Sequence, residues 1–185
     1  SALNMYVERD LDKKMVRTKD RPLPAGRLDP AWAMILGALC SLLSCFFFYV
    51  THHYVTLWLG IVALVLYVFC YTPLKQKSWL ALLVGSVPGA MPVVLGYTSL
   101  SNTVDGKAWA LFLWAFLWQI PHFLAISLFR EREYTEAGFP VLSKVAHEVF
   151  AKKMLLFTSW LLVISTFGLY MSRIIGEINL AVCLL

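Results

Sequence analysis

The sequence predicts an all-α protein, a polytopic transmembrane helix bundle that forms one domain over residues 1–185. Hydrophobic residues make up 59% of the chain. Charged residues make up only 15%, well below the roughly 25% that is typical of soluble domains. Five stretches are apolar over about 20 residues, the length that a helix needs to cross a bilayer. No Gly/Ser-rich linker or change in composition divides the chain, so a single membrane domain is expected.

The predicted spans cover, in order, residues 31–50, 54–71, 79–100, 108–129 and 154–170. A sixth apolar run begins near Ile178 and is too short within this chain to span a membrane. The chain also starts, at Ser1, inside a predicted helix. We therefore expect it to be incomplete at both ends.

The first predicted element is a charged helix that precedes the first span. Asn4, Glu8 and Asp12 follow one another at steps of four residues, so on a helix they share one face. Carboxylate and amide oxygens suit Mg²⁺, which is commonly shared between protein and substrate phosphates. A solvated helix end supported by an Asp10–Lys14 pair explains the same residues equally well.

A basic run directly follows this helix and contains Arg17, Lys19 and Arg21. Guanidinium groups match phosphate oxygens in a two-pronged geometry, so the run suits a diphosphate bound beside a metal ion. Positive charge at the cytoplasmic face, or contact with anionic lipid, is the simpler explanation. That explanation does not account for the carboxylates interleaved with the basic residues.

Charges gather on one side of the predicted bundle. Of the 16 Lys and Arg residues, only Lys107 and Arg173 fall on the other side, and the acidic residues follow the same division. The excess of positive charge predicts that the charged side is cytoplasmic. Because the basic residues lie in short segments between apolar runs, no soluble module presents them, and nucleic acid is excluded as a partner.

The loop before the third span and the span itself are the next candidates. Lys75, in the predicted cytoplasmic loop "YTPLKQKSW", can reach a bound diphosphate. Gly85, Pro88, Gly89 and Pro92 predict a broken helix that lines a cavity, although tight helix packing explains the same residues.

One helical face of the fourth span and of the residues after it carries Gln119, His122, Ile126, Arg130 and Glu133, at steps of 3, 4, 4 and 3, and all of these except Ile126 are polar. Polar side chains inside a membrane span are candidates for function. For His122 alone, a histidine hydrogen-bonded to a neighbouring helix is the favoured explanation. Glu131, Glu133 and Arg130 gain interest because they lie on the same side as Glu8 and Asp12.

Four segments together resemble the UbiA-type intramembrane prenyltransferases, and within that superfamily the branch that farnesylates protoheme IX. They are "NMYVERDLDKKMVRTKDRPLPAGRL", "YTPLKQKSW", "VGSVPGAMPVVLGY" and "WQIPHFLAISLFREREYTEAGFPVL". The resemblance covers nearly the whole chain, and the order of the segments is specific, whereas the first alone indicates only the superfamily. It implies a bundle of about nine helices around a cavity, of which two N-terminal helices and the last one or two are absent here.

The resemblance also implies roles for particular residues. Two acidic motifs at the cytoplasmic mouth would bind Mg²⁺ and the prenyl diphosphate. The metal ligands would be Asn4, Glu8, Asp12, Glu131 and Glu133. The diphosphate would be held by the basic run and by basic residues outside it: Arg9, Arg17, Lys19, Arg21, Lys75 and Arg130. The candidate catalytic residues are Asn4, Glu8, Asp12, Lys75 and Glu133. Glu8 and Glu133 stand where the family usually has Asp, which lengthens each side chain by one methylene group.

The activity implied by the resemblance is transfer of farnesyl from farnesyl diphosphate to the vinyl group of protoheme IX, giving heme O. Gln119 and His122 would then contact the heme. The expected setting is the lipid bilayer of a bacterial inner membrane, with heme A synthase or terminal oxidase assembly downstream. Three alternatives stay open: a UbiA-type enzyme with another acceptor such as an aromatic quinone precursor, a transporter or channel, and a heme-handling protein without catalysis. Carboxylates at one mouth rather than at the membrane midplane favour the enzyme.

Overall fold

A computed structural model describes residues 2–177, and every regular element in that range is helical. In chain order the elements are α1 (Ala2–Asp12), α2 (Pro30–Val50), α3 (Tyr54–Val65), the π-helix η1 (Leu66–Tyr71), α4 (Thr72–Leu74), α5 (Ala81–Ser101), α6 (Gly106–Phe129), α7 (Glu131–Glu136), α8 (Leu142–Val145) and α9 (Glu148–Met171). The predicted all-α class is confirmed.

All five predicted spans are present as helices long and apolar enough to cross a membrane, with α3, η1 and α4 forming one span, Tyr54–Leu74. The bounds differ most in the last span, which begins at Glu148 rather than at residue 154. This helix continues beyond the apolar run because Lys152 and Glu148 form an ion pair one turn apart, at 2.6 Å between Nζ and Oε1. The expected sixth run, near Ile178, lies outside the described residues.

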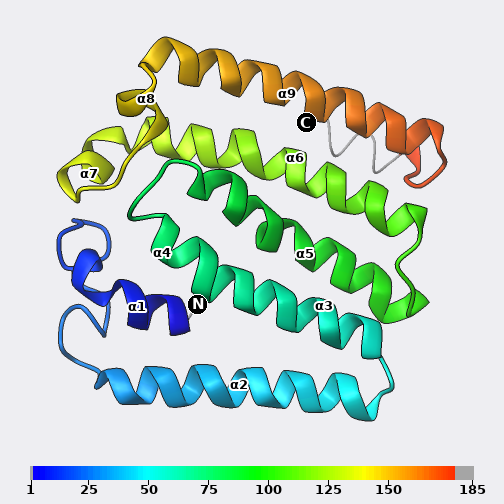
Figure 1. Ribbon diagram of the computed structural model, residues 1–185, viewed down its shortest axis with the longest axis horizontal. Helices are drawn as coiled ribbons and strands as arrows, with labels where there is room; N and C mark the ends of the chain where they lie inside the picture. Colours follow the sequence, from blue (N-terminus) through cyan, green and yellow to red (C-terminus); the bar gives the residue numbers. More distant parts are fainter. Residues whose placement is uncertain (1, 178–185) are drawn as a thin grey trace.

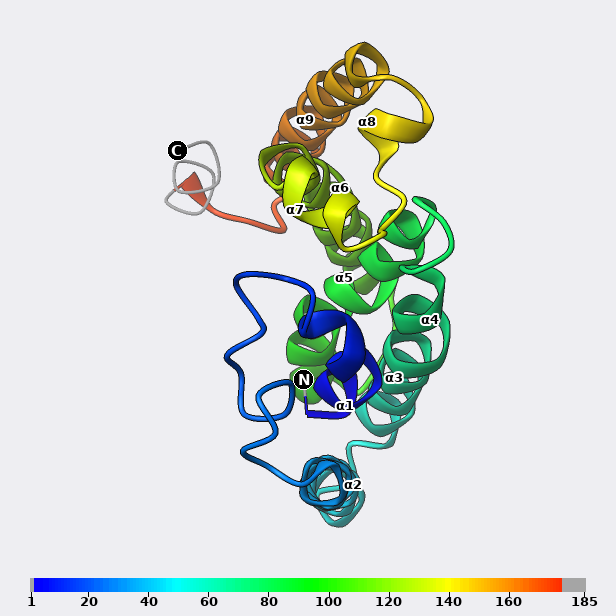
Figure 2. The same ribbon diagram turned by 90° about the vertical axis from the view of Figure 1, so that its left-hand side faces the viewer.

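The spans lie side by side in chain order, as Figure 1 shows from α2 through α3, α5 and α6 to α9. Seen from the end, the row is curved, and α1 lies on its concave side between α2 and α5 (Figure 2). The charged helix α1 therefore packs against α2 and α4 rather than extending into solvent.

Polar caps explain where two spans begin. Asp29 accepts a hydrogen bond from the backbone N–H of Ala31 at 2.8 Å, and Pro30 occupies the first turn of α2. Asp105 accepts from the N–H groups of Lys107 and Ala108, both at 3.0 Å, at the start of α6. Each cap supplies acceptors for backbone donors that have no partner inside the helix.

Helix α5 is the centre of the row, and the prediction that it is broken is wrong. It runs without interruption from Ala81 to Ser101 through both prolines, and α6 likewise runs through Pro121. The alternative of tight packing holds instead: a Cβ at Gly89 would lie 2.8 Å from the side-chain carbon Cδ of Gln119. Neighbouring helices support the proline-containing segments by packing closely against them.

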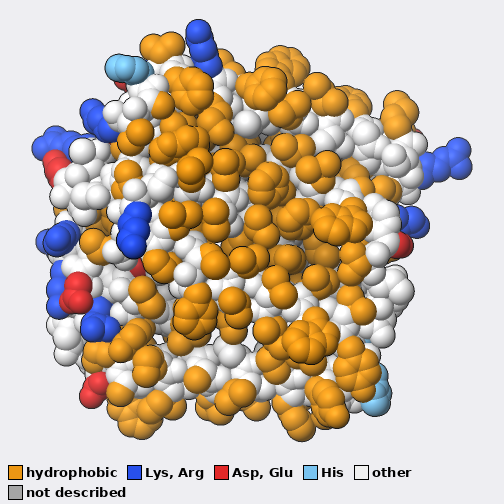
Figure 3. Space-filling model, viewed as in Figure 1, with side chains coloured by type: hydrophobic (Ala, Val, Ile, Leu, Met, Phe, Trp, Pro, Cys, Tyr) orange, Lys and Arg blue, Asp and Glu red, His pale blue; other side chains and the backbone are white. Residues whose placement is uncertain are grey.

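The outer surface of the spans is apolar. Side chains such as Phe46, Trp58, Leu113 and Trp160 are each more than half exposed. Figure 3 shows a broad hydrophobic face over the middle of the helices, with most of the charged side chains where the helices end. A surface of this kind is stable only against lipid or other apolar helices. The chain is therefore an integral, multi-pass membrane protein.

Candidate functional site

Helix α1 presents two buried carboxylates toward the other spans. Glu8 is 4% exposed and Asp12 is 5% exposed, while Asp10 between them is exposed. The amide of Asn4 donates from Nδ2 to Oε2 of Glu8 at 2.9 Å. The step of four residues thus gathers the three predicted side chains along one face, as expected for a helix.

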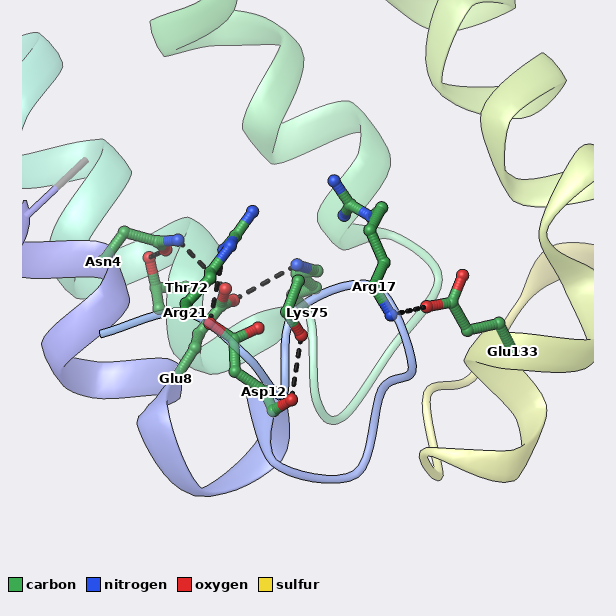
Figure 4. Close-up of polar contacts among 9 residues, drawn as sticks. Asn4, Glu8, Asp12, Arg17, Arg21, Thr72, Lys75 and Glu133 are labelled. Atoms are coloured by element: carbon green, nitrogen blue, oxygen red, sulfur yellow. Dashed lines mark hydrogen bonds and ion pairs between the residues drawn. The ribbon is translucent and has the colours of Figure 1, made fainter. Parts of the chain in front are cut away.

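Each buried carboxylate is paired with a basic side chain that the sequence also singled out (Figure 4). Lys75 donates from Nζ to Oε1 of Glu8 at 3.2 Å, and Arg21 donates from Nη1 to Oδ2 of Asp12 at 3.3 Å. Lys75 reaches α1 because it ends the second span, in the turn after α4. A buried carboxylate needs a positive partner, and these two cations supply it.

The segment that follows α1 joins this pair of contacts to the second acidic motif. The hydroxyl of Thr18 donates to the backbone carbonyl of Asp12 at 2.9 Å, which folds the segment back over the helix end. The backbone N–H of Arg17 donates to Oε1 of Glu133 at 3.3 Å. Arg130 donates from Nη1 to Oε2 of the same carboxylate at 3.0 Å. The two acidic motifs, more than 100 residues apart in sequence, therefore lie at the same end of the bundle (Figure 4).

Glu131 points to a different partner from Glu133. Its carboxylate accepts from Nζ of Lys144, near α8, at 2.7 Å. The Lys144 ammonium holds the pKa of Glu131 below its usual range, and Glu131 in turn raises the pKa of Lys144. This ion pair joins α7 to α8, and among the described residues Glu131 forms no hydrogen bond or ion pair with α1.

Two predicted diphosphate-binding residues lie outside this set of contacts. Arg9 packs its guanidinium 4.7 Å from the ring centre of Tyr6, on α1 itself. Lys19 is exposed. The Asp10–Lys14 pair offered by the simpler explanation is replaced by Asp10–Lys13, at 3.0 Å, and this contact lowers the pKa of Asp10.

Gln119 and His122 have separate environments on α6. Gln119 donates from Nε2 to the carbonyl oxygen of Gly89 at 3.0 Å and so joins α6 to α5. His122 is exposed on the helix surface, with its ring stacked on Trp118 at 4.7 Å between centres. The structure does not bring these two side chains into contact with the carboxylates.

An apolar cavity of about 100 Å³ lies beside Lys75, between the α4–α5 turn and the α6–α8 segment. Its aromatic lining comes from Tyr71, Trp79, Phe123, Tyr134 and Phe139. Lys75 lies at its rim, with Nζ 5.1 Å from the ring centre of Phe139. The cavity volume is below the roughly 300–1,000 Å³ of typical ligand pockets, so the space can take only a short part of the hydrocarbon of a ligand whose head is anionic.

The acidic residues supply oxygen donors but not a complete metal site. Among residues 2–177, no three His, Cys, Asp or Glu side chains lie close enough to hold a metal ion by themselves. Asn4, Glu8 and Asp12 offer the amide and carboxylate oxygens that Mg²⁺ accepts, and Mg²⁺ usually takes its remaining ligands from water and phosphate. The residues therefore fit a Mg²⁺ ion that is shared with a diphosphate.

Sequence reasoning missed Thr72, which is fully buried and donates from its hydroxyl to Oδ1 of Asn4 at 3.0 Å. The sequence could have indicated Thr72, because it lies three residues before Lys75 and therefore on the same helical face. Thr72 directly follows a π-helical turn, and that turn leaves no clear mark in the sequence.

The sequence model described as the UbiA prenyltransferase family matches residues 1–185. Protoheme IX farnesyltransferase of Anaeromyxobacter dehalogenans is 43% identical over 169 residues, which are 91% of this chain and 57% of the relative. The enzyme of the same name from Sorangium cellulosum is 50% identical over 77% of this chain and 51% of the relative. That of Symbiobacterium thermophilum is 38% identical over 97% and 60%. The chain thus spans between half and three fifths of the length of these relatives. No solved structure matches it significantly.

Proposed function

The chain belongs to the UbiA prenyltransferase family, and from this premise we propose that the protein carrying it transfers farnesyl from farnesyl diphosphate to the vinyl group of protoheme IX. The observation that carries the proposal is the meeting of two acidic motifs and their basic partners at one end of a membrane bundle. Glu8 with Lys75, and Glu133 with Arg130 and the Arg17 backbone, come from four separate segments. The names of the similar curated proteins favour protoheme IX as acceptor.

In the proposed site, basic side chains hold the diphosphate. Arg17, Arg21 and Lys75 provide cationic donors for its oxygens, with Arg130 at the second acidic motif. Bound Mg²⁺, held by Asn4, Glu8, Asp12 and Glu133, would neutralise part of the charge on the leaving group. Arg9 and Lys19 are the weaker members of this set, because neither contacts it in the structure.

The reaction breaks the bond between C1 of the farnesyl group and the diphosphate oxygen, and the electron pair leaves with the diphosphate. Arg17, Arg21 and Lys75 stabilise the negative charge that grows on that oxygen. The vinyl π electrons form the new carbon–carbon bond to C1. Water adds to the resulting cation and loses one proton, which gives a hydroxyethylfarnesyl substituent. The aromatic cavity beside Lys75 keeps bulk water away from the allylic carbon before transfer.

We infer further that the chain forms one transmembrane prenyltransferase domain and that its charged end faces the cytoplasm. The distribution of Lys and Arg supports this orientation, with 14 of 16 at that end. For a bacterial protein the membrane would be the inner membrane. Gln119 and His122 would meet the heme from α6, and the exposed imidazole of His122 is free to do so in the described part of the chain.

The test uses Asp12→Ala in the full-length enzyme, purified in detergent and supplied with farnesyl diphosphate, heme B, an aromatic acid and Mg²⁺. We expect loss of heme O formation by mass spectrometry while the protein still accumulates in the membrane. Asp10→Ala is the matched control, because Asp10 is exposed and pairs only with Arg9 and Lys13. Heme O formation by Asp12→Ala at the rate of the control would refute the assigned site, and a farnesylated aromatic acid as the only product would refute the acceptor.

A further inference from the structure

Thr72 stands at the junction between the π-helix η1 and the last turn of the second span. Its backbone N–H donates to the carbonyl oxygen of Tyr67, five residues earlier, and its hydroxyl lies 2.8 Å from the same oxygen. A hydroxyl has a single proton to donate. The hydroxyl therefore has two acceptors within reach: the Tyr67 carbonyl oxygen, which also accepts the backbone N–H, and Oδ1 of Asn4, 3.0 Å away, for which the described residues offer no other donor.

The orientation of the Asn4 amide follows from its two neighbours. An ionised carboxylate can only accept hydrogen bonds, so the NH₂ group of Asn4 must face Glu8, at 2.9 Å. The amide oxygen then faces Thr72, whose hydroxyl is the donor it needs. A carbonyl oxygen has two lone pairs, so the contact with Thr72 leaves one of them available.

The contacts form a closed ring between α1 and the second span. It runs from Thr72 to Asn4, from Asn4 to Glu8, and from Glu8 to Lys75, which lies one turn after Thr72. Thr72 is fully buried and Glu8 nearly so, which means that water does not compete for these hydrogen bonds. A rotation of the Asn4 amide would therefore disturb the carboxylate of Glu8 directly.

Resting on the function proposed above, we propose that Thr72 is a positioning residue of the diphosphate site. Its hydroxyl fixes the amide of Asn4 and, through Asn4, the carboxylate of Glu8, so that both oxygens face a bound divalent cation. Thr72 ends the π-helical turn, and its hydroxyl contacts both the Tyr67 carbonyl of its own helix and Asn4 of α1. π-Helical turns inserted in α-helices occur frequently at functional sites.

The experiment compares Thr72→Val with wild type in the full-length enzyme. Binding of Mn²⁺ to the metal-free protein, without substrates, is measured by electron paramagnetic resonance, and the Mg²⁺ concentration for half-maximal heme O formation is measured separately. We expect both constants to rise about tenfold, the size of effect seen when a group that orients a metal ligand is removed. Thr72→Ser, which keeps the hydroxyl, should stay within about twofold of wild type.

Thr56→Val is the matched control. Thr56 is equally buried in the same span, and its hydroxyl donates to Oγ1 of Thr98 at 3.0 Å, near the far end of the bundle. Both valine variants should lower the thermal midpoint in EDTA, but only Thr72→Val should weaken Mn²⁺ binding. Equal Mn²⁺ affinity in the two variants would overturn the proposal.

Two further outcomes are decisive. If Thr72→Val does not accumulate, the same comparison is made with Thr72→Ala, and failure of both variants while Thr56→Val folds would show that the hydroxyl serves folding alone. If the wild-type enzyme makes no heme O, the proposed function fails, yet the Mn²⁺ measurement still tests Thr72.

Discussion

The pair of Glu8 and Lys75 gives the sharpest test of the charged end of the bundle. The carboxylate side chain is 5% exposed and the lysine side chain 27% exposed, with 3.2 Å between Nζ and Oε1. A hydrogen bond to a charged group contributes about 1.5–3 kcal/mol. Glu8→Gln keeps the shape but leaves a half-buried ammonium without a partner, so the free energy of unfolding should fall by about 2 kcal/mol. Lys75→Met should lower it by a similar amount, because it leaves the carboxylate unpaired.

The double variant Glu8→Gln/Lys75→Met should unfold no more easily than either single variant, since no unpaired charge remains. The assay is reversible unfolding of the full-length protein in mixed micelles, evaluated as a double-mutant cycle. The control is the pair Glu148 and Lys152, whose side chains are 59% and 62% exposed and whose coupling should be no more than about 0.5 kcal/mol. Additive effects of the two substitutions at Glu8 and Lys75 would show that the ion pair does not stabilise the fold.

Three other results are expected. Gly85→Ala should destabilise the protein by about 1–3 kcal/mol, because the new Cβ would lie 2.5 Å from the ring of Tyr71. Gly96→Ala in the same helix is the control: its Cβ meets nothing within 4 Å, so the variant should be as stable as wild type or more stable. Equal thermal midpoints of the two variants would contradict the close contact at Gly85. The stabilisation from Glu131, whose pKa is lowered, should be present above its ordinary pKa of 4.5 and fade as the pH falls through the lowered value. The stabilisation from Lys144, whose pKa is raised, should persist below 10.5 and fade as the pH rises through the raised value. Thermal midpoints of wild type and Glu131→Gln should therefore converge as the pH falls below 4.5 and through the lowered pKa, and a constant difference would argue against the ion pair. Inorganic diphosphate should bind the purified enzyme more tightly with Mg²⁺ than in EDTA, as measured by calorimetry. Equal affinities would show that the binding of diphosphate and the binding of a divalent cation are not coupled.

The spans were predictable because a run of about 20 apolar residues has few other stable arrangements. The face of Asn4, Glu8 and Asp12 was predictable for a similar reason, since helical periodicity fixes which residues are neighbours. The continuity of α5 was not, because Pro88 and Pro92 break a helix only where neighbours fail to support it.

Which residues the site side chains contact also could not be predicted from the sequence. Glu131 and Glu133 differ by two positions on a short helix, and the fold of the distant segments decides that one meets Lys144 and the other Arg17. Thr72 follows a π-helical turn, and the six apolar and aromatic residues of that turn do not indicate its geometry.

The ion pairs of the site give a physical reason for coupling between diphosphate and a divalent cation. Lys75 and Arg21 neutralise the buried carboxylates of Glu8 and Asp12 in the protein alone. A diphosphate that recruits these two side chains removes the positive partners of both carboxylates, and a buried carboxylate without a partner is strongly unfavourable. A divalent cation at the same carboxylates restores the balance of charge and at the same time contacts the diphosphate oxygens. By linkage the two ligands should then strengthen each other's binding by the same factor, so the buried carboxylates are a reason to expect tighter diphosphate binding in the presence of a divalent cation.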